Sequence, residues 1–413
     1  MKQLASPVLL IWAAQAHCCW AFGTQQYRSS MNSNQRLDTW RLSASLEERL
    51  VDDDVLNRQS SAESNWHIPV KNLAPPFPNG PCGGTLVTLP PEDTFKLDVS
   101  LSGNDIVLPP RPIRVWLPPD YDGGEQKRHP VLYCHDGQNA MMDEESWTGR
   151  SWRLMGGLTR WMDHSMASGG EKSQTKESSA QHVMPIVVLL PSVEGDLLPG
   201  IRRRHLEYGG LEIPFAKAHT DFVAKTVKPL VDSLFATEPA AESTFAIGSS
   251  MGGQASLNLL LQYPNLFGGA ACLSPFFAPT TLDRVRRVLR ENPQRLTNKR
   301  IYMDIGGDLQ DKTVPFFHVW DHVTPKNFWN PGYFWLDTSL QGSVREMRDI
   351  LERGRVPHCY IEVPAARHNE WAWSNRIHWP ISFLFDEALT PHKTFPLPGD
   401  NSGDKALPSS SKR

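Results

Sequence analysis

Two kinds of hydrophobic pattern follow one another along the chain. In residues 85–89, 95–101 and 113–117, apolar and polar positions alternate, which is typical of half-buried antiparallel strands. From residue 131 onwards the pattern changes to short, continuous apolar runs, at 131–134, 186–190, 244–247, 269–273, 301–305 and 361–363. Central strands of a parallel sheet read in this way because helices cover both of their faces.

Helical patterns separate these apolar runs. Residues 222–235, 253–262 and 344–353 repeat their apolar positions at helical spacing. Strands that alternate with helices form βαβ units with right-handed crossovers. The sequence therefore predicts an α/β fold with a mostly parallel central sheet, helices on both faces and an antiparallel N-terminal β extension.

The two ends of the chain have a different composition from the middle. Residues 1–16 combine a basic start, an apolar stretch and an Ala-Gln-Ala end, the three parts of a secretory signal peptide. We expect 17–75 to be a low-order targeting or linker segment, 83–388 to be the folded domain and 390–413 to be a disordered tail. A secreted protein is the main expectation. The basic, Ser-rich and Asn-rich composition of 23–45 leaves plastid targeting through a bipartite leader as the alternative.

Charge and cysteine content exclude several classes of protein. Lys and Arg number 42 against 45 Asp and Glu, and this balance produces no overall field that would attract nucleic acid or anionic lipid. No apolar run reaches the roughly 18 residues of a membrane span. The six cysteines form no C-x-x-C pair, so neither a disulfide scaffold nor a metal site is expected. An enzyme or a binding domain remains.

The strongest chemical signal is the G-x-S-x-G pattern at 248–252. It follows the predicted strand 244–247 and opens the predicted helix, which is the context that a nucleophile elbow requires. Ser250 is therefore the candidate nucleophile, and a glycine-rich turn without chemistry is the alternative. The amide of Met251, at the helix N-terminus, is one candidate oxyanion donor. The amide of Gln138, in the loop after an earlier strand, is the other.

A serine nucleophile needs a base and an acid that orients the base. His368 follows the last predicted strand, where a loop reaches the edge of the sheet that carries the elbow. Asp308 follows two glycines after the strand 301–305 and is the best candidate for the acid, with Asp311 or a Ser-His dyad as alternatives. Asp304 lies within that strand and is expected to be structural.

Several strings resemble the esterase family of α/β hydrolases, which includes enterochelin-type, feruloyl and acetylxylan esterases, S-formylglutathione hydrolase and mycolyltransferases. The strings that carry the resemblance are RVWLPPDY at 114–121, PVLYCHDGQN at 130–139, RHLEY at 204–208, LSP at 273–275 and HNEWAW at 368–373. The resemblance implies Ser250 as nucleophile, His368 as base and the same two amides as oxyanion donors. It also implies a structural Arg204–Glu207 pair near the site. The spacing of the acid departs from the family pattern.

The sequence thus predicts a serine carboxylester hydrolase with a Ser-His-Asp triad, no metal and no organic cofactor. Residues 313–339 are rich in aromatic rings, and Trp320, Trp329 and Trp335 are candidates for a substrate pocket, although such rings also complete ordinary cores. Stacking on sugar or phenolic rings favours a small or carbohydrate-linked ester. Acyl transfer to an alcohol and a catalytically silent binding module are the alternatives, while the oligomeric state stays open. His135 and Asp136 are expected to be buried scaffolding.

Overall fold

The computed structural model describes residues 67–69, 73, 80–90, 108–124, 126–169, 183–193, 196–198, 201–307, 332–364 and 366–386. All of them belong to the compact unit 56–413. The predicted signal peptide 1–16, the predicted strand 95–101 and the predicted tail 390–413 lie outside the described residues, so these three expectations stay predictions. None of the described helices has the length and hydropathy of a membrane-spanning segment.

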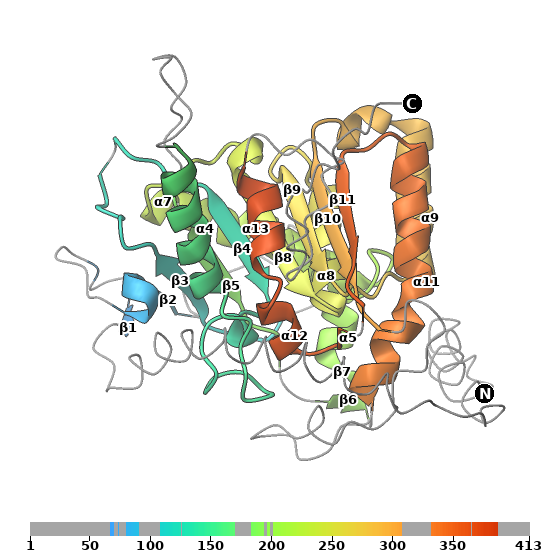
Figure 1. The fold of residues 1–413 in the computed structure, drawn as a ribbon, viewed down its shortest axis with the longest axis horizontal. Helices are drawn as coiled ribbons and strands as arrows, with labels where there is room; N and C mark the ends of the chain where they lie inside the picture. Colours follow the sequence, from blue (N-terminus) through green and yellow to red (C-terminus); the bar gives the residue numbers. More distant parts are fainter. Residues whose placement is uncertain are drawn as a thin grey trace, which may run out of the picture. The chain divides into compact units, whose positions relative to one another are not determined.

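Within the described residues, nine strands form one sheet in the order β1-β2-β3-β5-β4-β8-β9-β10-β11 (Figure 1). The strands are β1 His67–Pro69, β2 Thr85–Leu89, β3 Ile113–Leu117, β4 Val131–His135, β5 Ile186–Leu190, β8 Thr244–Ser249, β9 Gly269–Leu273, β10 Arg300–Ile305 and β11 His358–Glu362. β3 is antiparallel to both β2 and β5, and every pairing from β5 to β11 is parallel. This arrangement confirms the predicted parallel sheet with an antiparallel extension.

Helices cover both faces of this sheet. α4 (Leu154–Gly169) and α13 (His378–Phe385) pack against each other on one face and lie in front of the strands in Figure 1. On the other face, α8 (Met251–Gln262) packs against β8 and β9, and α11 (Gly332–Arg353) packs against β10 and α9 (Pro279–Glu291). The remaining described elements are η2 Pro81–Gly83, η4 Gly137–Asn139, β6 Asp196–Leu198, β7 Ile201–Arg202, α5 Arg203–Glu207, α6 Pro214–Phe222, η5 Val223–Val227, α7 Lys228–Leu234, η6 Ala241–Ser243, η7 Pro293–Leu296 and α12 Glu370–Ser374.

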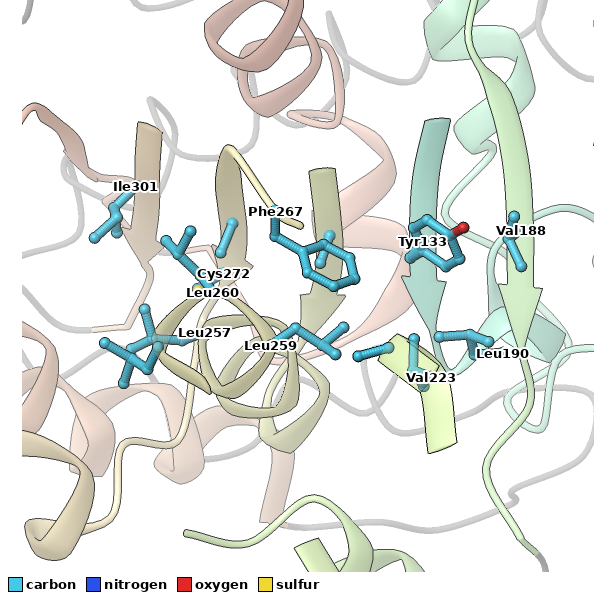
Figure 2. Close-up of a cluster of buried hydrophobic side chains, with 14 of the residues drawn as sticks. Tyr133, Val188, Leu190, Val223, Leu257, Leu259, Leu260, Phe267, Cys272 and Ile301 are labelled. Carbon is cyan, nitrogen blue, oxygen red and sulfur yellow. The ribbon is translucent and has the colours of Figure 1, made fainter. Parts of the chain in front are cut away.

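The core consists of two layers, one on each face of the sheet. Successive side chains of a strand point to opposite faces, so Val131 and Tyr133 join the layer under α8, while Leu132 and Cys134 join the layer under α4 and α13. Figure 2 shows the first layer, in which the rings of Tyr133 and Phe267 meet edge to face with centroids 5.6 Å apart. Each buried aliphatic or aromatic side chain contributes roughly 1.5–3 kcal/mol to folding. The continuous apolar runs of the central strands are explained by this two-sided burial.

Three boundaries differ from the sequence prediction. β11 begins at His358 rather than at 361, because this edge strand is only half-buried and its first residues carry no strong apolar signal. α11 begins at Gly332, well before the predicted start at 344. The strand His67–Pro69 extends the sheet into the segment 17–75, which was expected to have little order. Three residues that end in proline are too short to give a periodic signal.

Candidate active site

Ser250 occupies a sharp turn between β8 and α8. Its backbone angles, φ 55° and ψ −125°, lie in a region that L-residues seldom adopt and that costs about 1–3 kcal/mol. The neighbouring glycines are required by close contacts: a Cβ on Gly248 would lie 2.3 Å from the carbonyl oxygen of Gly252. A Cβ on Gly252 would lie 2.9 Å from Oδ2 of Asp136. The G-x-S-x-G pattern thus folds as the elbow that the sequence predicts, with the serine at the N-terminus of α8.

Backbone hydrogen bonds hold this turn against the end of β9. The amide of Ser250 donates to the carbonyl of Leu273 at 2.9 Å. The carbonyl of Ser250 accepts from the amides of Gly253 and Phe276, both at 3.1 Å. The strained conformation is therefore held from two sides, by α8 and by the turn that follows β9.

The segment after β4 lies beside the elbow, because β4 and β8 are parallel neighbours. A Cβ on Gly137 would lie 2.7 Å from the backbone of Leu189, so glycine lets this segment pass close to β5. The side chain of Gln138 donates to Ser192 Oγ at 2.8 Å and accepts from the Ser192 amide at 3.1 Å. The amides of Gln138 and Met251 donate none of the turn, loop and cap hydrogen bonds between described backbone groups. Both amides lie at the start of a helix, Gln138 in η4 and Met251 in α8.

His135 and Asp136 are buried scaffolding, as predicted. His135 is fully buried and its Nδ1 lies 2.9 Å from Ser256 Oγ. Burial lowers the pKa of His135 well below its ordinary value, so the imidazole is neutral. Asp136, with φ 55°, accepts two hydrogen bonds from Arg204 at 2.8 and 2.6 Å. Together they fix the start of the segment that carries Gln138.

The expected pairing of Arg204 with Glu207 is wrong, because each side chain pairs with another residue. Arg204 is bound to Asp136, and Glu207 instead pairs with Arg111 at 2.7 Å and with Arg203 at 3.0 Å. The two residues are only three apart on the short helix α5, but each side chain reaches a different partner. Sequence proximity could not reveal partners that are distant in the chain.

His368 follows β11 and contacts a carboxylate. The ring is 4% exposed, and its Nδ1 lies 2.9 Å from Oδ1 of Asp337, a fully buried residue of α11. Oδ2 of Asp337 accepts from the amide of Gly306 at 3.1 Å and lies 3.3 Å from Ser274 Oγ. A Cβ on Gly306 would lie 2.3 Å from this carboxylate oxygen, so the glycine at the end of β10 makes room for the acid. The Trp373 ring meets the His368 ring edge to face, with centroids 5.0 Å apart.

A comparison with protein families gives a match over residues 109–330, to the family described as "Putative esterase". This range is more than half of the chain and includes both the Gln138 segment and the elbow of Ser250. The chain belongs to this family. The protein is accordingly an esterase with an α/β-hydrolase fold, which confirms the predicted class.

Solved structures similar to the esterase include ferulic acid esterases and a siderophore hydrolase. A ferulic acid esterase has a TM-score of 0.47 and 16% identity, and the match covers 73% of this chain and 98% of the other. The ferulic acid esterase of Anaeromyces mucronatus has a TM-score of 0.41 and 16% identity, with coverages of 73% and 89%. The siderophore hydrolase EstB of Aspergillus nidulans has a TM-score of 0.43 and 16% identity, and the match covers 67% of this chain and 91% of the other. No curated protein matches the chain.

The carboxylate beside His368 in the esterase is one that the sequence analysis did not name. Asp308 lies outside the described residues, and the carboxylate that contacts His368 is Asp337. Asp337 lies in the segment 313–339, whose aromatic residues pointed to a pocket wall and not to catalysis. The order Ser, Asp, His along the chain allowed any acidic residue between β10 and His368, and no spacing singled out Asp337.

The tryptophans proposed for the pocket of the esterase have no described side chains. Trp320 and Trp329 lie outside the described residues, and only the backbone of Trp335 is described, as part of α11. The predicted pocket residues therefore stay predictions. Among the described residues, no group of three or more His, Cys, Asp or Glu side chains is arranged to hold a metal ion.

A ring that the sequence reasoning missed bridges two parts of the site. Nε1 of Trp147 donates to Glu370 Oε1 at 2.7 Å, and the amide of Trp147 donates to Asn139 Oδ1 at 3.2 Å. Glu370 is 2% exposed, and burial raises its pKa above the ordinary value. Trp147 therefore ties the Gln138 segment of the esterase to the helix that follows His368.

Proposed function

We propose that the protein hydrolyses carboxylic esters with Ser250, His368 and Asp337 as its triad. The observation that carries this proposal is the buried hydrogen bond between His368 and Asp337, at the same edge of the sheet as the Ser250 elbow. With Nδ1 of His368 donating to the carboxylate, the unprotonated Nε2 is the basic nitrogen. The arrangement has the parts of an acyl-transfer site in the chain order of α/β hydrolases.

In the first step, Ser250 Oγ attacks the ester carbonyl while His368 Nε2 takes the hydroxyl proton. The oxyanion that forms accepts hydrogen bonds from the amides of Met251 and Gln138, each worth roughly 10²–10³ in rate. His368 then gives its proton to the departing alcohol. Asp337 holds the imidazole in the required tautomer and stabilises the imidazolium.

In the second step, water replaces the alcohol. His368 takes a proton from the water, the resulting hydroxide attacks the acyl carbonyl, and the carboxylic acid leaves as Ser250 recovers its proton. No step requires a metal or an organic cofactor. Acyl transfer differs only in that an alcohol takes the place of water.

A small or carbohydrate-linked ester is the proposed substrate class. Its support is the aromatic content of 313–339, with Trp320, Trp329 and Trp335, together with the half-buried ring of Trp147 beside the Gln138 segment. A screen of acetyl, feruloyl and glutathione thioester substrates tests this class. Addition of a sugar or short-chain alcohol to the same assays separates transfer from hydrolysis by the ester product.

The catalytic proposal is tested with p-nitrophenyl acetate and a fluorophosphonate probe. Wild-type protein should turn over the ester and carry the probe on Ser250, as located by mass spectrometry. Ser250→Ala should lose both. Ser249→Ala is the matched control, because it removes the same atoms from the adjacent, buried residue of β8. Equal turnover by wild type and Ser250→Ala would refute the proposal, and a protein that neither turns over ester nor takes the probe would be a binding module.

We also propose that residues 1–16 direct secretion as a signal peptide. The basis is their composition, and plastid import is the alternative. N-terminal sequencing of the mature protein from its native cell, with the compartment determined by fractionation, distinguishes the two.

A further inference from the structure

Ser274 lies where the nucleophile and the acid of the site come together. It follows β9 directly, is fully buried and has φ 38°, an uncommon value for a serine. The residue before it, Leu273, accepts the hydrogen bond from the Ser250 amide, and Phe276 donates to the Ser250 carbonyl. The turn that holds the elbow is thus the same turn that presents the Ser274 side chain to Asp337.

The hydrogen bonds of Ser274 Oγ leave one direction for its proton. Two groups donate to this oxygen: Arg376 Nη2 at 2.7 Å and Trp373 Nε1 at 3.3 Å. A hydroxyl has two lone pairs and one proton, so these two donors occupy both lone pairs. The third neighbour is Oδ2 of Asp337, at 3.3 Å, which can only accept when ionised. The hydroxyl therefore donates to Asp337.

Arg376 is fixed behind this hydroxyl by a second carboxylate. Nε and Nη2 of Arg376 each donate to Asp304 at 3.0 Å, and both side chains are buried. Burial opposes the charge of Arg376, but Asp304 and Asp337 together raise its pKa above the ordinary value. Asp304 is held in turn by the Ser274 amide at 2.8 Å and by the Tyr302 hydroxyl at 3.0 Å. The guanidinium thus has a fixed position from which it polarises the Ser274 hydroxyl.

We propose that Ser274 is a positioning residue of the esterase site. Its hydroxyl orients Asp337 through a hydrogen bond that is strengthened because Arg376 donates to the same hydroxyl. This inference rests on the proposed function. Of the three hydrogen bonds that Asp337 accepts, the bonds from Gly306 and Ser274 hold Oδ2, and the bond from His368 uses Oδ1. Loss of the Ser274 bond leaves a single contact on Oδ2, about which the carboxylate can turn away from the imidazole.

Removal of the hydroxyl has two expected consequences. The carboxylate loses its fixed orientation, so kcat falls about tenfold while KM stays within twofold, because Ser274 does not touch substrate. A carboxylate that turns away also stabilises the protonated imidazole less, so the acid limb of the kcat/KM profile, where the base His368 takes up its proton, should shift to lower pH. Among the described residues, Glu370 interacts electrostatically with His368, and Arg376, which is paired with Asp304, interacts with Asp337; all three groups remain in the variants.

The experiment compares Ser274→Ala, Ser274→Gly and Thr244→Val in pH-rate profiles with p-nitrophenyl acetate. Glycine accommodates φ 38° without strain, so Ser274→Gly separates loss of the hydroxyl from backbone effects. Thr244→Val removes an equally buried hydroxyl, bonded to the Ala240 carbonyl at 3.0 Å, from the opposite end of β8. Thermal unfolding of all three variants measures the change in stability separately from the change in catalysis.

Both Ser274 variants should show the lower kcat and the shifted acid limb, and Thr244→Val should show neither. A wild-type profile for either folded Ser274 variant would overturn the inference while leaving the esterase function intact. Failure of the function itself would be distinguishable, because wild-type protein would then have no turnover that depends on Ser250.

Discussion

Asp337→Asn is the substitution that tests the triad most directly. Asparagine has the same shape, but only its carbonyl oxygen can accept a hydrogen bond. Since the Gly306 amide and the Ser274 hydroxyl both donate to the Oδ2 position, the carbonyl of the new side chain should face them. Its NH₂ group then faces Nδ1 of His368 and forces that nitrogen to become the acceptor. The proton moves to Nε2, where it blocks the base.

The expected loss follows from this tautomer. A carboxylate-to-amide change at the same place in a serine protease triad lowers kcat by about 10⁴, equivalent to about 5.4 kcal/mol of transition-state stabilisation. The assay is steady-state hydrolysis of p-nitrophenyl acetate at pH 7.5, with enzyme concentration set by fluorophosphonate titration of wild type. The fold should survive, because all contacts of Asp337 keep a polar partner.

Asp308→Asn is the matched control, since the sequence alone favours that residue as the acid. Its kcat should stay within about twofold of wild type. A large loss in Asp308→Asn with little change in Asp337→Asn would refute the assignment. That result would mean that the contact with His368 is a resting arrangement that the reaction does not use.

Three further predictions concern pH, the oxyanion segment and the Trp147 bridge. Burial lowers the pKa of His219 well below its ordinary value, so below about pH 6.5 the unfolded chain takes up a proton that the folded chain does not. His219 should therefore lower the free energy of unfolding by about 1.4 kcal/mol between pH 7.5 and 5.5. In urea titrations, the His219→Phe variant should lose that much less stability over the same pH range than wild type. Gly137→Ala should lower kcat about 10²-fold by displacing the Gln138 amide, which active-site-titrated kinetics would show while near-ultraviolet circular dichroism stays native. Glu370→Gln keeps an acceptor for Trp147 and should have a kcat near that of wild type, whereas Glu370→Ala should lower kcat about tenfold. An unchanged kcat in Glu370→Ala would show that the Trp147–Glu370 hydrogen bond does not contribute to catalysis.

The features that the sequence predicted are those set by interactions between residues close together in the chain. The elbow depends on residues within five positions of one another, because Gly248 and Gly252 face each other across the turn. The central strands are recognisable because both faces are buried and most of their positions are apolar. His368 could be found because it directly follows a strand whose neighbours were already assigned.

The parts that it missed depend on contacts between distant segments. Asp337 and His368 are 31 positions apart, and the partners Asp136 and Arg204 are 68 apart. A carboxylate in an amphipathic helix is indistinguishable in sequence from one on a solvated face. Only the packing of α11 against β10 reveals that Asp337 is fully buried.

The contacts of Asp337 explain how this esterase can carry a long connection between β10 and His368. The family match ends at residue 330, before both Asp337 and His368. α11 is nevertheless fastened to the end of β10 at one residue, because the Gly306 amide donates to Asp337 and the Gly306 carbonyl accepts from Gln341 at 2.8 Å. The next amide, of Gly307, donates to the Ala366 carbonyl at 2.8 Å and fastens the histidine loop to the same point. Because Asp337 and the His368 loop are both hydrogen-bonded to these two glycines, the length of the intervening chain does not set the distance between them. Spacing along the sequence is therefore a poor guide to the proposed acid.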